Sequence, residues 1–311
     1  MMSGMQVLII GASGFIGRHL FHYCKRNGIS VAGTYYKNKI SDEYIYFDIN
    51  NQGFSDLMKK VAEKMDCREL RVILCSADTD MDSCKMNEKS SYVLNVQNTK
   101  KLLYEIRQSG IKTAFLSSEA VFDGEKGMYS EKDETNPVTV YGKQKREVEN
   151  YIVKTMKDAL IFRISRAVGS SFGEADIFDD FYKKIRDGRK ILCLRNQSFC
   201  VTEVDDIASA IILALDKDLQ GIYNISSKNY VSRYELALLY AEKVFQGNAS
   251  ILEVEYSEMG FMDNRHIKGG LDGTKLNNVL HLEYKDLDTI MKDYMRTFNA
   301  YMSFGKSGDK I

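Results

Sequence analysis

Two short segments of the chain hold side chains that could move a proton. Ser117 and Ser118 end an apolar run, and Tyr141 and Lys145 follow at a spacing of four residues. Residues four apart lie on one face of a helix, so the Lys145 ammonium can sit beside the Tyr141 phenol and favour its ionisation. A phenol with a pKa of about 10 shuttles protons poorly at neutral pH unless a cation stabilises the phenolate. Because Ser118 could hydrogen-bond the same substrate oxygen, the pattern predicts a proton-transfer site.

A glycine-rich turn near the start of the chain could bind phosphate. The apolar run 5–10 breaks at Gly11, and residues 15–26 have the periodicity of an amphipathic helix. At such a strand-to-helix turn, backbone amides and the helix N-terminus can face a pyrophosphate. This context favours a dinucleotide site over an incidental glycine turn. The cofactor contacts expected here are Gly11, Ser13, Gly14, Phe15, Ile16, Gly17 and Arg18.

Strands and helices alternate after this turn, and these elements must position the reactive groups. The expected strands are 30–35, 44–47, 71–75, 112–117 and 160–165, and the expected helices are 54–65, 88–109 and 141–157. Such alternation predicts an α/β fold of the Rossmann type, a doubly wound parallel sheet with helices on both faces. We assign residues 1–168 to an NAD(P)-binding domain. Residues 169–311 should form mainly a smaller substrate-binding lobe, with segments within 200–226 returning to the sheet.

The carboxyl ends of the strands should gather the remaining ligand contacts. Open parallel sheets bind ligands beyond these ends, where the winding reverses. Asp48 follows a short strand and could hydrogen-bond an adenine, although it could equally be an exposed turn aspartate. The further cofactor contacts expected at strand ends are Asp48, Ile49, Cys75, Ser76, Ala77 and Ser117.

The end of the second strand bears on the choice of cofactor. Residues 34–37 lack the acidic side chain expected about 20 residues beyond the glycines for a ribose 2′-hydroxyl. This favours NADP over NAD. Tyr35 and Lys37 are further expected cofactor contacts. Arg18 and Lys37 could pair with a 2′-phosphate, but both could simply be solvated cations.

Composition limits the partners and the compartment. The chain has 311 residues, and its 43 basic and 43 acidic side chains give a formal net charge of zero, which predicts neither nucleic acid nor an acidic membrane as a partner. Six cysteines without a Cys-x-x-Cys pair favour free thiols in a reducing compartment, and the histidines form no metal pattern. The N-terminal apolar run is too short for a signal or membrane segment, so we expect a cytoplasmic protein. From the histidine and cysteine pattern we expect no metal.

At its glycine turn and at the segments that hold Ser118, Tyr141 and Lys145, the chain resembles the extended short-chain dehydrogenase/reductase family. The resemblance is closest to the dTDP-4-dehydrorhamnose reductase branch of that family. GASGFIG resembles the family's Gly-x-x-Gly-x-x-Gly turn, SSEAVFDG (117–124) its Ser-Thr-Asp-Tyr-Val-Phe-Asp-Gly segment, and YGKQK (141–145) its Tyr-Gly-x-x-Lys. The resemblance implies NAD(P)H-dependent reduction of a 4-keto nucleotide sugar, with Ser118, Tyr141 and Lys145 as the catalytic set. It also implies that Tyr141 and Lys145 contact the cofactor, Lys145 at the nicotinamide ribose. LNVQNTK (94–100) resembles the family's Asn-Val-x-Gly-Thr helix, which implies that Asn95 lies near the active site and the cofactor.

The chain departs from the branch at its expected substrate wall. Glu119 and Ala120 replace an Asp-Tyr pair, and Phe199 and Val201 replace a Gly and a Pro. Reductase chemistry is therefore predicted more securely than the particular sugar. The substrate contacts expected from the resemblance are Ser118, Glu119, Ala120, Val121 and Tyr141. Three further cations could reach a diphosphate: Arg189, Arg195 and Arg265. An arginine in such a loosely patterned region is more often a surface cation than a ligand.

Two other functions fit the same resemblance. An NAD-dependent nucleotide-sugar epimerase would use the same fold, whereas a dehydratase would carry a second acid where this chain has Ala120. A non-catalytic regulatory subunit similar to the methionine adenosyltransferase β subunit would also share the fold, but the intact Ser118, Tyr141 and Lys145 favour an enzyme. A homodimer is one possible assembly.

Overall fold

A parallel sheet forms the centre of the larger part of the molecule. The computed structural model describes residues 4–308, and within them seven parallel strands lie in the order β3-β2-β1-β4-β5-β6-β10. The winding reverses between β1 and β4, so the carboxyl ends of these two strands border the crevice where ligands bind in such folds. The bounds are β1 Gln6–Ile10, β2 Ser30–Tyr35, β3 Ile45–Tyr46, β4 Leu70–Leu74, β5 Lys112–Ser118, β6 Leu160–Ile164 and β10 Gly221–Ile225.

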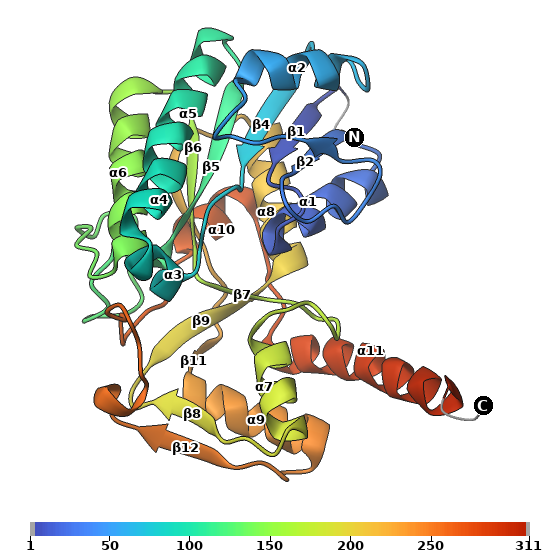
Figure 1. Cartoon of the computed structure of the whole chain (residues 1–311), viewed down its shortest axis with the longest axis vertical. Helices are drawn as coiled ribbons and strands as arrows, with labels where there is room; N and C mark the ends of the chain where they lie inside the picture. The colour runs from blue at the N-terminus through green and yellow to red at the C-terminus, as the bar shows by residue number, and fades with distance from the viewer. Residues whose placement is uncertain (1–3, 309–311) are drawn as a thin grey trace.

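Helices cover both faces of this sheet because successive residues of a buried strand point to opposite sides. Val7 and Ile9 of β1 belong to one apolar core, and Leu8 and Ile10 belong to another. The first core includes side chains of α1 (Phe15–Arg26), α8 (Val204–Asp216) and α10 (Thr274–Leu280). The second core includes side chains of α2 (Phe54–Ala62), α5 (Thr99–Gln108) and α6 (Val140–Thr155). The doubly wound fold expected from the sequence is thereby confirmed (Figure 1).

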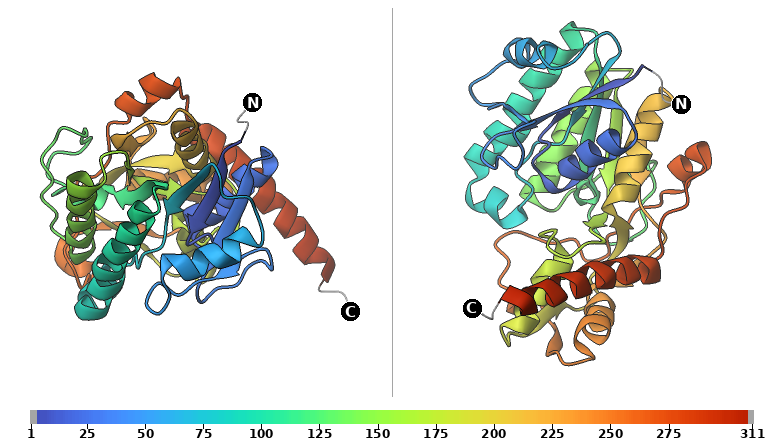
Figure 2. Two further views of the ribbon diagram at one scale, coloured as in Figure 1. Left: turned by 90° about the horizontal axis from the view of Figure 1, so that it is seen from above. Right: turned by 90° about the vertical axis from the view of Figure 1, so that its right-hand side faces the viewer.

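A smaller lobe lies beyond the carboxyl ends of the strands (Figures 1 and 2). Its core includes the buried rings of Phe178, Phe181, Tyr240 and Tyr294, and the hydroxyls of the two tyrosines are 2.8 Å apart. A three-stranded sheet and a two-stranded parallel sheet flank this core. The bounds are β7 Arg166–Val168, β8 Ile191–Leu194, β9 Ser198–Glu203, β11 Tyr230–Ser232, β12 Ile251–Val254, α7 Ile177–Arg186, α9 Arg233–Phe245 and α11 Leu287–Gly308.

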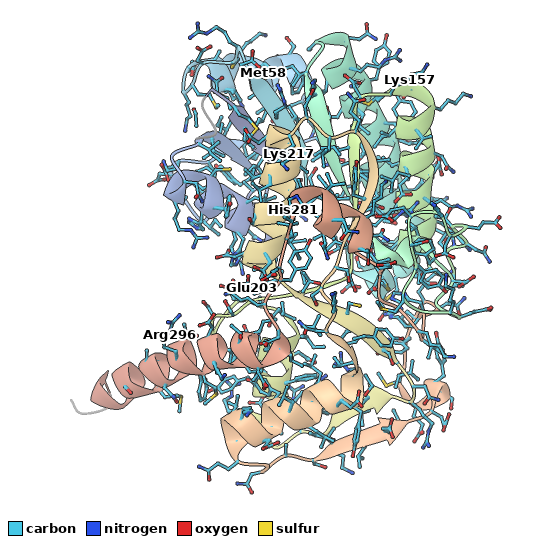
Figure 3. All side chains as sticks on the ribbon, turned by 180° about the vertical axis from the view of Figure 1, so that it is seen from behind. Met58, Lys157, Glu203, Lys217, His281 and Arg296 are labelled. Carbon is cyan, nitrogen blue, oxygen red and sulfur yellow. The ribbon has the colours of Figure 1, made fainter. Side chains whose placement is uncertain are left out.

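Later parts of the chain return to the central sheet. Helix α8, which begins after Glu203 and ends before Lys217, packs against α1, and β10 pairs with β6 at the sheet edge. Figure 3 shows α8 from behind, beside α10, which ends before His281. The chain therefore passes between the two proposed parts more than once, and segments after residue 168 belong to the central sheet and its helices.

The expected helix 88–109 contains a local irregularity. It consists of α4 (Glu88–Tyr92), a π-helical segment η1 (Val93–Asn98) and α5. The preceding helix α3 (Met81–Met86) is too short to show helical periodicity in the sequence. No helix within residues 4–308 has the length and apolar character needed to cross a bilayer.

Candidate active site

The glycine turn brings β1, β4 and α1 into close contact. Gly11 has φ +93°, and a Cβ there would lie 2.7 Å from the backbone nitrogen of Ser76. A Cβ on Gly17 would lie 2.3 Å from the carbonyl oxygen of Gly11. The Gly11 amide also donates a 2.9 Å hydrogen bond to Thr34 Oγ1, which ties the turn to β2. Side chains at either glycine would push these elements apart, so the turn requires glycine at both places.

One cavity of about 240 Å³ extends from this turn across the ends of β2 and β3. Nine of the expected cofactor residues line it, and none of its lining residues is acidic. The expected residues on its wall are Gly11, Ser13, Gly14, Tyr35, Lys37, Ile49 and the strand end Cys75–Ala77. The sequence did not single out Thr34, Asn38 or Asn50, which also line it.

A second cavity of about 290 Å³ continues from the first and contains the reactive groups. The two share Gly11, Gly14, Cys75 and Ala77, so they form one crevice. Its wall includes the expected residues Phe15, Ile16, Gly17, Ser117, Ser118, Tyr141 and Lys145. The structure thus brings the glycine turn and the proposed catalytic set together from three separate parts of the chain.

Lys145 is held in place by the main chain of β5. Its Nζ donates a 2.8 Å hydrogen bond to the Leu116 carbonyl and lies 5.7 Å from the centroid of the Tyr141 ring. Burial lowers the pKa of Lys145 to about 8, although the nearby Cys75 and Glu149 oppose this shift. The ammonium can therefore lose its proton within an ordinary assay range of pH.

Tyr141 lies in the first turn of α6. Thr139 caps this helix by accepting a 2.9 Å hydrogen bond from the Gly142 amide. A Cβ on Gly142 would lie 2.0 Å from the Ala120 carbonyl, so the helix start packs directly on the turn after Ser118. Burial raises the pKa of Tyr141 above its ordinary value, and the Ser118 hydroxyl opposes this shift. Before ligands bind, the phenol is thus held in its protonated form.

The crevice fits a nicotinamide dinucleotide. Ser76 Oγ and Ser117 Oγ are buried and have no hydrogen-bond partner within the described part of the chain. Ser76 lines the part of the crevice that contains Lys37, and Ser117 lines the part that contains Tyr141. A buried hydroxyl without a partner costs free energy, so polar atoms of a bound ligand would satisfy both. The start of α1, Gly14 to Gly17, also lines the crevice, so backbone amides at this helix N-terminus can face a pyrophosphate.

Asn95 and Asp48 lie behind the crevice wall. Asn95 Nδ2 donates to the Asp78 carbonyl and to Gln144 Oε1, at 2.9 and 2.7 Å, and so joins the loop after β4 to the catalytic helix. Asp48 is 5% exposed, and its carboxylate accepts hydrogen bonds from Asn50 and Asn51. Neither residue lines the cavities, but Asp48 binds Asn50, which does. Asp48 is therefore not the exposed turn residue considered above.

Arg18 is directed away from the proposed 2′-phosphate position. Its Nη2 lies 2.5 Å from Glu174 Oε2 and 2.7 Å from the Glu174 carbonyl oxygen, in the loop before α7. It does not line the cavity that contains Lys37. The long-range ion pair competes for the guanidinium, and nothing in the sequence near Arg18 signals this partner.

The residues after Ser118 form packing contacts instead of a cavity wall. Ala120 and Val121 are fully buried, and neither lines the cavities described here. Glu119 accepts hydrogen bonds from Ser165 Oγ (2.9 Å) and the Gly270 amide (2.7 Å). Burial alone would raise the pKa of Glu119, but His266, the Gly270 amide and the charge of Arg166 lower it. None of the three residues lines these cavities, and their expected contact with substrate stays a prediction.

A third cavity, of about 400 Å³, adjoins the catalytic crevice at Ser165–Arg166 and extends into the lobe. Of the three cations named from the sequence, Arg265 lines it, whereas Arg189 and Arg195 pair with Asp187 and Glu255 at the surface. Its other cations are Arg166, Lys184, Lys190 and Arg233. The sequence analysis singled out none of these four, although Arg166 directly follows the predicted strand 160–165.

Comparison with known proteins places this arrangement in a family. Residues 5–299 match the family described as "RmlD substrate binding domain". The chain belongs to this family. The match covers both the glycine turn and the cationic cavity of the lobe, and it confirms the resemblance stated from the motifs.

Two curated relatives have different activities. A "Probable low-salt glycan biosynthesis reductase Agl14" from Haloferax volcanii is 25% identical over 309 residues, covering 96% of this chain and all of the relative. A "Methionine adenosyltransferase 2 subunit beta" from Xenopus tropicalis is 26% identical over 250 residues, covering 77% of this chain and 72% of the relative. The relatives of this chain thus include a protein named as a probable reductase and one named as an enzyme subunit.

Solved structures share the fold over almost the whole chain. A "hypothetical dTDP-4-dehydrorhamnose reductase" from Sulfolobus tokodaii has a TM-score of 0.79 at 25% identity, covering 93% of this chain and 99% of its own. The dTDP-4-dehydrorhamnose reductase of Bacillus anthracis, in complex with NADP, has a TM-score of 0.78 at 21% identity, covering 95% and 99%. MoeE5 in complex with UDP-glucuronic acid and NAD has a TM-score of 0.78 at 19% identity, with the same coverage. Because the last two structures are less than 25% identical to this chain, they show only that the fold is shared.

Proposed function

We propose that this chain is an NAD(P)H-dependent reductase of the keto group of a nucleotide-linked sugar, with a 4-keto sugar as the first candidate. The observation that supports it most is the convergence of Ser118, Tyr141 and Lys145 on the crevice that begins at the glycine turn. The family match and the reductases among the relatives support the same class of reaction.

The roles of the three side chains follow from their positions. When bound, the reduced nicotinamide would supply the hydride for the substrate carbonyl carbon. Tyr141 donates its proton to the carbonyl oxygen, which its protonated state in the free chain permits. Lys145 stabilises the phenolate that remains, and Ser118 orients the oxygen by a hydrogen bond. The protein thus contributes position and charge to the transfer.

The lobe supplies the proposed nucleotide site. The cavity beyond Ser165 contains five lysine or arginine side chains and two aromatic rings, Phe199 and Phe261. Cations suit a diphosphate and aromatic rings suit a base. A substrate that spans this cavity and the crevice would present its sugar near Tyr141.

NADP is the proposed preferred cofactor, and NAD is the alternative. The absence of an acidic residue from the cavity wall near Lys37 supports NADP, because a carboxylate there would repel a 2′-phosphate. Related structures hold either cofactor. A homodimer remains part of the proposal.

The decisive experiment is NADPH oxidation by the purified chain with a panel of 4-keto nucleotide sugars. We expect one mole of NADPH to be consumed for each mole of sugar reduced, and Tyr141→Phe to abolish turnover while still binding cofactor. Stereochemical inversion without net NADPH consumption would indicate an epimerase. A stoichiometric protein partner, with no turnover across the panel, would instead indicate a regulatory subunit.

A further inference from the structure

Arg166 is an unpaired cation beside the catalytic crevice. It is the first residue of β7 and directly follows Ser165, which lines the crevice together with Ser118 and Tyr141. Its side chain is exposed within the lobe cavity, and its guanidinium carbon lies 5.2 Å from the centroid of the Phe199 ring. Within the described residues no carboxylate lies at ion-pair distance from it.

The nearest buried acid, Glu119, already has other hydrogen-bond partners. Glu119 attracts Arg166 through space, but its carboxylate accepts from Ser165 Oγ and the Gly270 amide, and His266 Nε2 lies 3.6 Å from its other oxygen. These contacts hold Glu119 behind the cavity wall. Arg166 therefore keeps its guanidinium fork free for a ligand.

The other cations of the cavity suffice for a diphosphate. Arg265 pairs with Asp82 at 2.8 Å, and Lys184 and Arg233 share Asp180 at 2.9 and 3.2 Å. The three cations Lys184, Lys190 and Arg233 and the anion Asp180 have a net charge of two positive units. This matches the charge of about −2 on a diphosphate diester. Figure 1 shows β8, which follows Lys190, on the far side of the lobe, whereas β7 lies next to the central sheet. Arg166 is thus the additional cation, on the sugar side.

We propose that Arg166 is a specificity-determining residue that binds a carboxylate on the sugar itself, so that the substrate is a nucleotide-linked keto sugar acid. This inference rests on the proposed function and specifies its substrate class. A guanidinium binds a carboxylate through two parallel hydrogen bonds, and the Phe199 ring lies against the guanidinium of Arg166. A neutral deoxysugar would leave this charge unpaired in the cleft.

Binding of unreactive probes to the full chain with NADP⁺ tests the inference. UDP-glucuronate and UDP-glucose differ at the sugar carboxylate, and the matching thymidine diphosphate pair controls for the base. We expect the acidic probe of a pair to bind at least about 10-fold more tightly than the neutral one by calorimetry. Arg166→Gln should remove most of that difference and change the affinity for the neutral probe less than about 3-fold.

A matched control is Arg195→Gln, which removes an exposed cation that pairs with Glu255 outside the cavity. It should leave both affinities unchanged. The inference is wrong if neither acidic probe binds more tightly than its neutral partner. It is also wrong if Arg166→Gln weakens both probes equally, because Arg166 would then bind the diphosphate. Preferential acidic binding without any NADPH-dependent turnover would contradict the proposed reaction and leave the carboxylate site in place.

Discussion

Lys145 Nζ lies 5.7 Å from the centroid of the Tyr141 ring and donates its hydrogen bond to the Leu116 carbonyl of β5. The ammonium is therefore fixed to the sheet, and the phenol is fixed to the first turn of α6. Because two rigid elements set the distance between them, the charge acts on the phenol without a direct hydrogen bond in the free chain.

Removal of the Tyr141 hydroxyl should stop the reaction. Tyr141→Phe takes away the proposed proton donor, so kcat should fall at least about 100-fold. Cofactor affinity, measured by NADPH fluorescence, should change less than about 3-fold, because the ring remains in its buried site. Undiminished kcat would show that another group donates the proton.

The reduction should weaken as Lys145 loses its proton. Its pKa is lowered to about 8, so the ammonium is present below pH 8 and lost above it, whereas the pKa of Tyr141 is raised. We therefore expect kcat/KM for reduction to decline above an apparent pKa near 8. Lys145→Arg keeps the charge and should move the decline to higher pH. A profile that is flat to pH 10 would contradict this role.

Lys37 should contribute to cofactor discrimination, and Arg18 should not. Lys37 lines the cavity next to the expected ribose position, while Arg18 pairs with Glu174. Lys37→Ala should weaken NADPH binding about 2- to 5-fold, in keeping with a solvent-exposed charge pair, and leave NADH binding unchanged. Arg18→Gln should alter the NADPH to NADH affinity ratio less than about 2-fold, measured in the same titration.

His19 should stabilise the folded chain in a pH-dependent way. Burial opposes its charge, but hydrogen bonds to Asp205 and Glu174 outweigh this and raise its pKa to about 9. A raised pKa contributes stability that is complete below about pH 6.5 and lost as pH rises through 9. Urea unfolding should show His19→Gln less stable by about 2–3 kcal/mol at pH 6, with a smaller difference at pH 9.5.

The control for that series is His22→Gln, which changes an exposed histidine on the same helix. Its unfolding free energy should follow that of the unsubstituted chain at each pH. A constant deficit for His19→Gln across the range would show that packing, and not charge, explains its effect.

Glu149 and Arg163 should form a sensitive point of the core. The two side chains are 3% and 4% exposed and lie 2.7 Å apart. Glu149→Gln leaves a buried guanidinium without its counter-ion, so the free energy of unfolding should fall by about 3–5 kcal/mol. Glu147→Gln, on the same helix but 41% exposed, should cost less than about 1 kcal/mol. Equal effects in urea unfolding would contradict the distinction.

Short-range patterns in the sequence were sufficient for the fold and for the catalytic set. The glycine turn, the apolar strands and the four-residue spacing of Tyr141 and Lys145 each depend on residues close in the chain, and periodicity records such contacts directly. The alternation of strands and helices then predicts a parallel sheet, whose strand ends must meet at one edge. The meeting of Ser118 with the glycine turn follows from that topology.

Only the tertiary structure decided which of the remaining side chains reach the cavities. Arg18 turns to Glu174, and Glu119 turns to Ser165 and Gly270, because ion pairs and buried hydrogen bonds form between residues far apart in the chain. Strand β7 has three residues, too few for a recognisable period, yet it places Arg166 beside the crevice. Local sequence records which elements form, but the free energy of burying charges selects partners across the whole fold.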